Sequence, residues 1–126
     1  MAISAFEDEV FELIRRRLGL PVDHISLNNT IRLYMDEIKQ RILNYTRQPA
    51  VPKGLIYTWT NMVIDLLKVR DFGLPEVAAL IGNGAVDVKI GDTTVKLGAT
   101  GSAPVDAIVT GYASDLRRYR RMGWSG

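Results

Sequence analysis

The sequence contains no cysteine and only one histidine, His24, among its 126 residues. The absence of cysteine excludes disulfide bonds, thiolate metal sites and cysteine nucleophiles, and is typical of chains that fold in a reducing cytoplasm. Any triad with a histidine base would depend on His24, which lies near the predicted start of a helix without a serine elbow motif. The motifs of zinc proteases, P-loops, dinucleotide-binding folds and EF-hands are also missing. We therefore expect no enzyme activity, no cofactor and no metal site.

Long apolar runs are missing as well. No stretch of about 18 apolar residues occurs, which argues against a membrane-spanning helix. The N-terminus lacks the pattern of a secretory signal, so we expect none, and we expect no membrane partner. The apolar content of 47% excludes intrinsic disorder. A chain of this length can build one hydrophobic core, and a single domain covering residues 1–126 is expected.

The net charge of +2 is unevenly distributed along the chain. Residues 1–114 hold 12 Lys+Arg and 13 Asp+Glu, a net charge of −1, whereas residues 115–126 hold four arginines and one aspartate, a net charge of +3. This basic C-terminal segment contains Arg117, Arg118, Tyr119, Arg120, Arg121 and Trp124. Two interpretations of this segment stay open. Either its positive charges stabilise the C-terminal end of a helix dipole, or the segment forms a surface that contacts phosphates or partners that accept aromatic side chains.

Four segments have the apolar periodicity of amphipathic helices: residues 4–18, 24–45, 52–68 and 104–121. The third is apolar around more than half of its circumference, which predicts either a central position in the fold or a second face buried against another subunit. Within it, Trp59 is predicted to anchor the core. Residues 70–84 are less regular: residues 75–81 could form two helical turns, but the glycines here favour a flexible arm.

The apolar period changes from 3.6 to 2 after residue 85, which indicates a β-hairpin over residues 86–97. The alternating apolar residues and the two-residue turn of this hairpin are Val86, Val88, Ile90, Gly91, Asp92, Val95 and Leu97. An isolated hairpin is only marginally stable in water, so it must pack on helices or pair with another chain. The sequence therefore predicts a mainly α fold: a bundle of about four helices with one protruding β-hairpin before the C-terminal helix.

This order of elements resembles the small head–tail connector proteins of long-tailed bacteriophages, also called adaptor or head-completion proteins. The segments that carry the resemblance are Asn44-Tyr45-Thr46, residues 52–57, residues 61–67, Ile90-Gly91-Asp92-Thr93-Thr94-Val95 and residues 115–121. Together they cover the chain from about residue 6 to residue 124, with the weakest match over residues 70–87.

The resemblance implies a structural protein of the virion that is made in the cytoplasm of a bacterial host. Such proteins form a ring of about a dozen subunits whose head-to-tail contacts close by rotation. The ring lies beneath the portal, extends the DNA channel without sequence-specific DNA binding, and gives downstream connector, stopper or tail-completion proteins an attachment face. The hairpin offers strand edges for a subunit interface, and by analogy the C-terminal arm, residues 117–126, contacts the portal protein.

A small nucleic-acid-binding helical protein is the alternative, with the C-terminal arginines and Tyr119 as its contacts. A helical partner-binding module of unrelated biology also stays open. Salt-dependent DNA binding through the C-terminal segment would favour the nucleic-acid interpretation. Ring-shaped particles without DNA binding would favour the connector.

Overall fold

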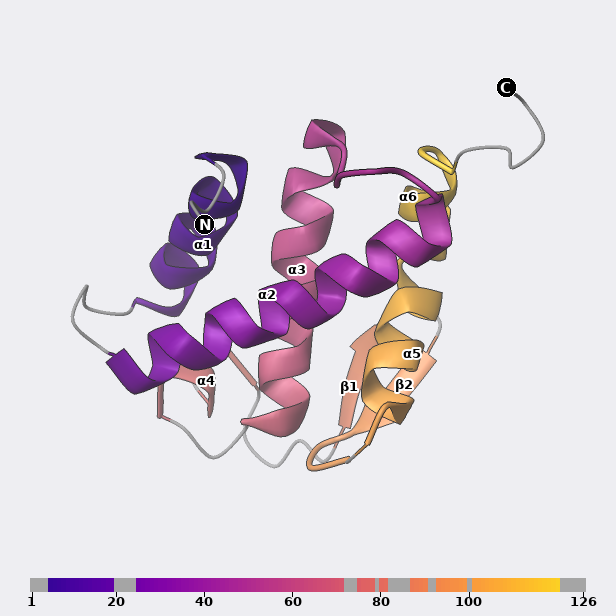
Figure 1. Cartoon of the computed structure of the whole chain (residues 1–126). Helices are drawn as coiled ribbons and strands as arrows, with labels where there is room; N and C mark the ends of the chain where they lie inside the picture. Colours follow the sequence, from indigo (N-terminus) through magenta and orange to yellow (C-terminus); the bar gives the residue numbers. More distant parts are fainter. Residues whose placement is uncertain are drawn as a thin grey trace, which may run out of the picture.

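The computed structural model in Figure 1 describes residues 5–19, 25–71, 75–78, 80–81, 87–90, 93–99 and 101–120. Its elements are α1 (Ala5–Leu18), α2 (Ile25–Thr46), the 3₁₀ turn η1 (Lys53–Leu55), α3 (Ile56–Arg70), α4 (Pro75–Ala78), β1 (Asp87–Ile90), β2 (Thr93–Lys96), α5 (Ala103–Gly111) and α6 (Ala113–Arg117). The mainly helical fold with a hairpin before the C-terminal helices is confirmed. The predicted third helix begins as a 3₁₀ turn. Of the two turns predicted over residues 75–81, the described residues show one, α4, and Leu80 and Ile81 donate main-chain hydrogen bonds to Val77 and Ala78.

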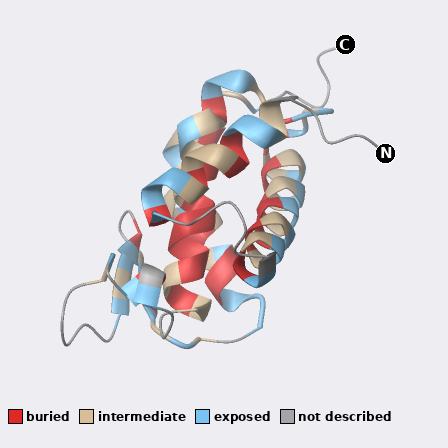
Figure 2. Cartoon of the chain, turned by 90° about the vertical axis from the view of Figure 1, so that its left-hand side faces the viewer, coloured by how far each residue is buried: buried red, intermediate tan, exposed pale blue. Residues whose placement is uncertain are grey.

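Helix α3 is the centre of the molecule. In Figure 1, α2 crosses in front of α3, while α1 lies on one side and the hairpin with α5 on the other. Figure 2 shows buried residues concentrated along the central helix. Its buried apolar residues are Trp59, Met62, Val63, Ile64, Leu66, Leu67 and Val69. These residues point to several sides of the helix, so the broad apolar surface of α3 is buried within its own chain. This is the central position in the fold that was the first of the two interpretations of this segment.

Trp59 anchors this core, as predicted. Only 1% of its surface is exposed, and its ring centroid lies 5.7 Å from that of Phe6 in a tilted arrangement. The indole Nε1 donates to the main-chain oxygen of Met35 at 3.2 Å. A buried indole N–H with a partner avoids the desolvation penalty of an unpaired donor. Trp59 thereby joins α1, α2 and α3.

The predicted continuous helix over residues 104–121 is wrong, because the chain breaks between α5 and α6 at Tyr112 (φ −105°, ψ 14°). The hydroxyl of Tyr112 donates to Oδ2 of Asp65 on α3 at 2.6 Å, which holds the side chain against the core. The preceding Gly111 has a low helix propensity, so interrupting the helix at this point costs little free energy. After the break α6 buries Leu116, and the described chain continues in turns to Arg120.

The hairpin has the predicted alternation and loop length. Its antiparallel register pairs Val88 with Val95 and Ile90 with Thr93, so two residues separate the strands. The inner face carries these four residues, whereas the outer face carries Asp87, Lys89, Thr94 and Lys96, which are all exposed. The hairpin contacts α3 through β1 and α5 through both strands. It is therefore stabilised by helices of its own chain, one of the two possibilities that the sequence left open.

Candidate assembly surfaces

The hairpin presents one face to the core and the other to solvent. Ile90 and Val95 are 1% and 7% exposed, so these two predicted interface residues are core residues in this chain. Val88 and Leu97 are half-buried. The solvent face is polar and carries Asp87, Lys89, Thr94 and Lys96. The remaining predicted interface residues, Val86, Gly91 and Asp92, lie outside the described residues.

Two contacts fix the position of the hairpin. A Cβ on Gly111 would lie 2.5 Å from both the main-chain oxygen and Cγ2 of Ile90, so the glycine allows α5 to approach β1 more closely than any other residue could. Just after β2, the Gly98 amide donates to the main-chain oxygen of Val69 at 2.8 Å. The hairpin is thus held by a close packing contact on α5 and, just after β2, by a hydrogen bond to α3.

The C-terminal segment packs on the end of α2. The main-chain oxygen of Tyr119 accepts a hydrogen bond from Gln48 Nε2 at 2.7 Å, and the Tyr119 hydroxyl occupies the space that a Cβ on Gly54 would need. The guanidinium of Arg120 lies 5.5 Å from the centroid of the Tyr45 ring, within range of a cation–π interaction. The structure therefore holds the chain in place up to Arg120; Arg121 and Trp124 lie outside the described residues.

These contacts gather cations from two parts of the chain. Arg117, Arg118 and Arg120 are exposed, as are Arg47, next to Gln48, and Lys53, next to Gly54. We call these five residues the basic end. The sequence predicts its arginines at the end of the helix over residues 104–121 and in the C-terminal arm, but gives no sign of Arg47 and Lys53, because only the fold brings the turn after α2 next to Tyr119. The spacing of charges along the sequence holds no signal of this proximity.

The two predicted surfaces are attached to different parts of the molecule. The hairpin packs on α3 and α5, whereas the basic end is built on α2, η1 and α6. Helix α5 lies between them along the chain. It is joined to α6 at Tyr112 and to α2 by the Arg41–Asp106 ion pair. The chain can therefore present two different surfaces to two different partners.

A buried polar joint lies where α5 meets α6. Asp65 is 8% exposed; its carboxylate accepts the Tyr112 hydroxyl at 2.6 Å and lies 3.8 Å from Lys68 Nζ. Burial raises the pKa of Asp65 above its ordinary value, while the Tyr112 hydrogen bond opposes that shift. Burial and the Asp65 hydrogen bond also raise the pKa of Tyr112. Neither residue is predicted from the sequence as a site residue, although a carboxylate within an apolar helical segment is a detectable signal.

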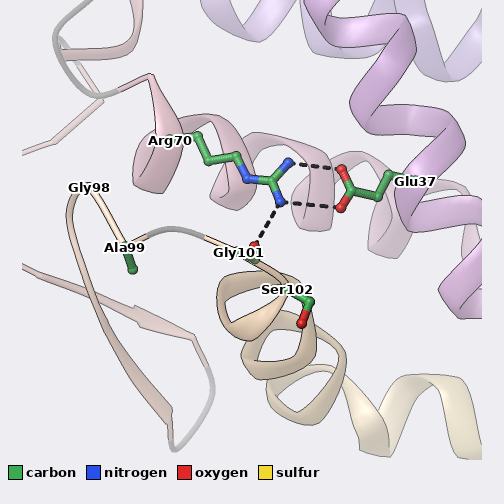
Figure 3. Close-up of a pocket in the computed structure, with 6 residues that line it drawn as sticks. All are labelled: Glu37, Arg70, Gly98, Ala99, Gly101 and Ser102. Atoms are coloured by element: carbon green, nitrogen blue, oxygen red, sulfur yellow. Dashed lines mark hydrogen bonds and ion pairs between the residues drawn. The ribbon is translucent and has the colours of Figure 1, made fainter.

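A second polar cluster clamps the loop between the hairpin and α5 (Figure 3). Arg70 donates to both carboxylate oxygens of Glu37, at 2.8 Å and 3.2 Å, and to the main-chain oxygen of Gly101 at 3.2 Å. This cluster lines a surface pocket of about 430 Å³ together with Gly98, Ala99 and Ser102. The two-pronged geometry of a guanidinium suits this role because it bonds a carboxylate and a carbonyl at once.

Tyr34 extends this cluster from α2 to the end of α3. The Arg70 guanidinium lies 5.2 Å from the Tyr34 ring centroid, and the Tyr34 hydroxyl donates to Asp71 Oδ2 at 2.8 Å. Burial and that hydrogen bond raise the pKa of Tyr34 to about 12. The cluster joins α2, α3 and the loop before α5, and we interpret it as a structural clamp.

Known proteins offer no guide to these surfaces. Among the described residues, no group of three or more His, Asp or Glu side chains could hold a metal ion, and none of the described helices has the length and apolarity needed to cross a membrane. No family model, curated protein or solved structure matches the chain. Its function is therefore inferred from its own sequence and geometry.

Proposed function

We propose that this protein is a structural subunit of the head–tail connector of a long-tailed bacteriophage, active in the virion and without catalytic activity or cofactor. About a dozen copies would form a ring that docks under the portal, extends the DNA channel and offers an attachment face to further connector or tail proteins. The observation that carries the proposal is the order of elements. Three long helices precede a two-residue-turn hairpin and C-terminal helices that end in a basic, aromatic segment.

The hairpin supports a role in ring assembly. A ring with head-to-tail contacts needs a surface on each copy that meets a different surface on the next. The outer face of the hairpin carries charges of both signs, with Lys96 paired opposite Asp87 and Lys89 opposite Thr94, and a two-stranded sheet has free edges that can accept another strand. Because Gly111 and Gly98 already fix the hairpin, little conformational entropy would be lost when a neighbour binds.

The basic end supports a separate role in portal contact. Arginine and aromatic residues dominate the energetics of protein interfaces because they combine apolar area with hydrogen bonding. Arg117, the last residue of α6, and Arg118 after it are exposed, and Tyr119 and Arg120 are held in place by Gln48 and Tyr45. We expect the portal surface that meets them to be acidic. Arg121 and Trp124 would extend this contact.

The charge distribution is compatible with a wall of a DNA channel. Each fixed phosphate contact adds affinity through counterion release and would slow the passage of DNA. Residues 1–114 carry a net charge of −1, so the body of the protein does not attract DNA strongly. DNA would pass without sequence-specific binding.

One observation favours the second candidate, a nucleic-acid-binding protein. Arg47 and Lys53 join Arg117, Arg118 and Arg120 in the basic end, so five exposed cations lie on neighbouring segments of the fold. A protein that neutralises that many phosphates would lose DNA affinity with a log–log salt slope of roughly −4 to −5 on a duplex. The connector proposal predicts that DNA binding is weak and does not depend on the base sequence.

The proposed function is tested by charge reversals on each surface and on a control site. The Lys89→Glu/Lys96→Glu variant should abolish ring assembly, whereas Arg117→Glu/Arg118→Glu should reduce binding to the portal protein of the same genome. Arg16→Glu, an exposed change on α1 outside both surfaces, should affect neither. Assembly is measured by electron microscopy and native mass spectrometry. Tight DNA binding that only the Arg117→Glu/Arg118→Glu change removes, without rings or portal binding, would establish the second candidate instead.

A further inference from the structure

A surface groove lies between the C-terminal part of α2 and the exposed side of α5. Its volume is about 560 Å³, within the range of about 300–1,000 Å³ that is typical of pockets for organic ligands. The residues that line it and matter here are Arg41, Tyr45, Asp106, Val109, Thr110 and Ala113. Arg41 and Asp106 form an ion pair that connects α2 to the start of α5. Tyr45, one turn further along α2, lies nearer the end of that helix.

The described chain ends beside this groove. Arg120 stacks its guanidinium over Tyr45, which is itself a lining residue, and Gln48 holds the main-chain oxygen of the preceding residue. Residues 121–126 follow, with the sequence Arg-Met-Gly-Trp-Ser-Gly. Six residues can extend over about 20 Å, whereas Arg41 and Tyr45 are separated along α2 by only about 6 Å. The segment is therefore long enough to cover the whole groove.

The chemistry of the segment matches that of the groove. Trp124 and Met122 offer large apolar surfaces, and an indole also needs an acceptor for its N–H. Val109, Ala113 and the Tyr45 ring provide an apolar wall. Asn44 lines the groove as well, and its side-chain amide oxygen can accept that N–H.

Charge is compatible with the same occupant. The segment adds a further cation, Arg121, next to Arg120. In the groove, the Asp106 side chain remains 59% exposed although it pairs with Arg41. A half-exposed carboxylate attracts a nearby cation, although solvent weakens the attraction.

We propose that residues 121–126 bind in this groove of their own molecule, with Trp124 packed against its apolar wall. Binding within the molecule is favoured because the segment starts at the groove, which gives it an effective concentration in the millimolar range. In the free chain the groove thus covers Trp124, and any partner that takes up the C-terminal segment must compete with it. The inference concerns the free chain and does not depend on the connector proposal.

The lack of native cysteine allows a direct test by disulfide trapping. Thr110→Cys and Ser125→Cys are combined in one variant, and Lys53→Cys with Ser125→Cys forms the matched control, because Lys53 lies next to Gly54, under Tyr119, but outside the groove. In a glutathione buffer, the effective concentration of the Thr110 pair should exceed that of the control by about tenfold or more. The product should have the mass of a monomer.

Other results would overturn the proposal. Equal effective concentrations in the two variants would mean that the segment does not occupy the groove. Disulfide-linked dimers of the Thr110 pair, in dilute solution, would mean that the groove takes the segment of a second copy. In the same background, Val109→Asp should reduce the Thr110 pair to the control level, and circular dichroism reports whether this variant remains folded. If it stays folded with an unchanged effective concentration, the assignment to the groove is wrong.

Discussion

The Gly111→Ala variant tests whether close packing of α5 on β1 holds the hairpin. The new Cβ would lie 2.5 Å from the main-chain oxygen and from Cγ2 of Ile90 and 2.9 Å from its carbonyl carbon. A rotamer change of Ile90 could move the methyl group, but it could not move the main-chain atoms, so α5 and the hairpin must separate. Gly111 does not have a left-handed backbone conformation, which means that alanine is not strained at this position by its φ angle.

The two physical effects of this substitution have opposite signs. Overpacking a close contact typically costs about 1–3 kcal/mol, whereas replacing a helical glycine by alanine gains up to about 1 kcal/mol when nothing obstructs the methyl group. We expect the clash to win and the free energy of unfolding to fall by about 1–2 kcal/mol. For a chain of this size, the thermal midpoint should fall by roughly 4 °C per kcal/mol.

Urea denaturation followed by far-UV circular dichroism measures the effect. Thr110→Ala is the matched control, since Thr110 is the neighbouring, exposed residue on α5 and its substitution should change the free energy of unfolding by no more than about 0.5 kcal/mol. If Gly111→Ala were as stable as the unsubstituted protein, or more stable, the hairpin would not be held by this contact. In the connector proposal, Gly111→Ala should also impair ring assembly more than Thr110→Ala, because it displaces the outer face of the hairpin.

Three further substitutions probe the polar clusters. Tyr112→Phe leaves buried Asp65 without its hydroxyl donor, so the free energy of unfolding should fall by about 1–3 kcal/mol in urea denaturation. NMR titration should show a still higher Asp65 pKa in this variant. An unchanged Asp65 pKa would refute the hydrogen bond between Tyr112 and Asp65. Because the folded-state pKa of Asp65 is raised, its contribution to stability is present at low pH and is lost as the pH rises through that pKa. The Asp65→Asn variant should therefore stabilise the protein most at neutral pH, relative to the unsubstituted protein. A gain in stability that grows on acidification would contradict this. Arg70→Lys breaks the two-pronged bond to Glu37, which is partly exposed, so the free energy of unfolding should fall by less than about 1 kcal/mol. Amide hydrogen exchange in the loop containing Gly101 should become faster. An unchanged exchange rate would argue against a clamp.

The sequence predicts the long helices well because burial of one face imposes a period on the chain. The first two predicted segments, residues 4–18 and 24–45, match α1 and α2 to within one residue at each end. The hairpin is equally predictable, since alternating residues with Gly91-Asp92 between them are typical of two strands with a tight turn. The break at Tyr112 could not be predicted in this way, because Ile108, Tyr112 and Leu116 keep the helical period across it. It depends on Asp65, a residue 47 positions away in the sequence.

The candidate surfaces are only partly predictable for a similar reason. Alternation shows that one face of the hairpin is apolar, but not what covers it; the structure assigns Ile90 and Val95 to the chain's own core. The C-terminal arginines were visible in the sequence, whereas the addition of Arg47 and Lys53 to the basic end depends on tertiary contacts of Tyr119. Periodicity reports which residues are buried, and tertiary contacts decide which exposed residues come together.

The mass of the purified protein, measured by native mass spectrometry with and without the portal ring of the same genome, tests the central claim most directly. The connector proposal predicts a complex in which about a dozen copies bind one portal ring, and predicts that Arg117→Glu/Arg118→Glu prevents its formation while Arg16→Glu does not. A protein that stays monomeric beside the portal at all concentrations, yet binds duplex DNA through the same arginines, would contradict it.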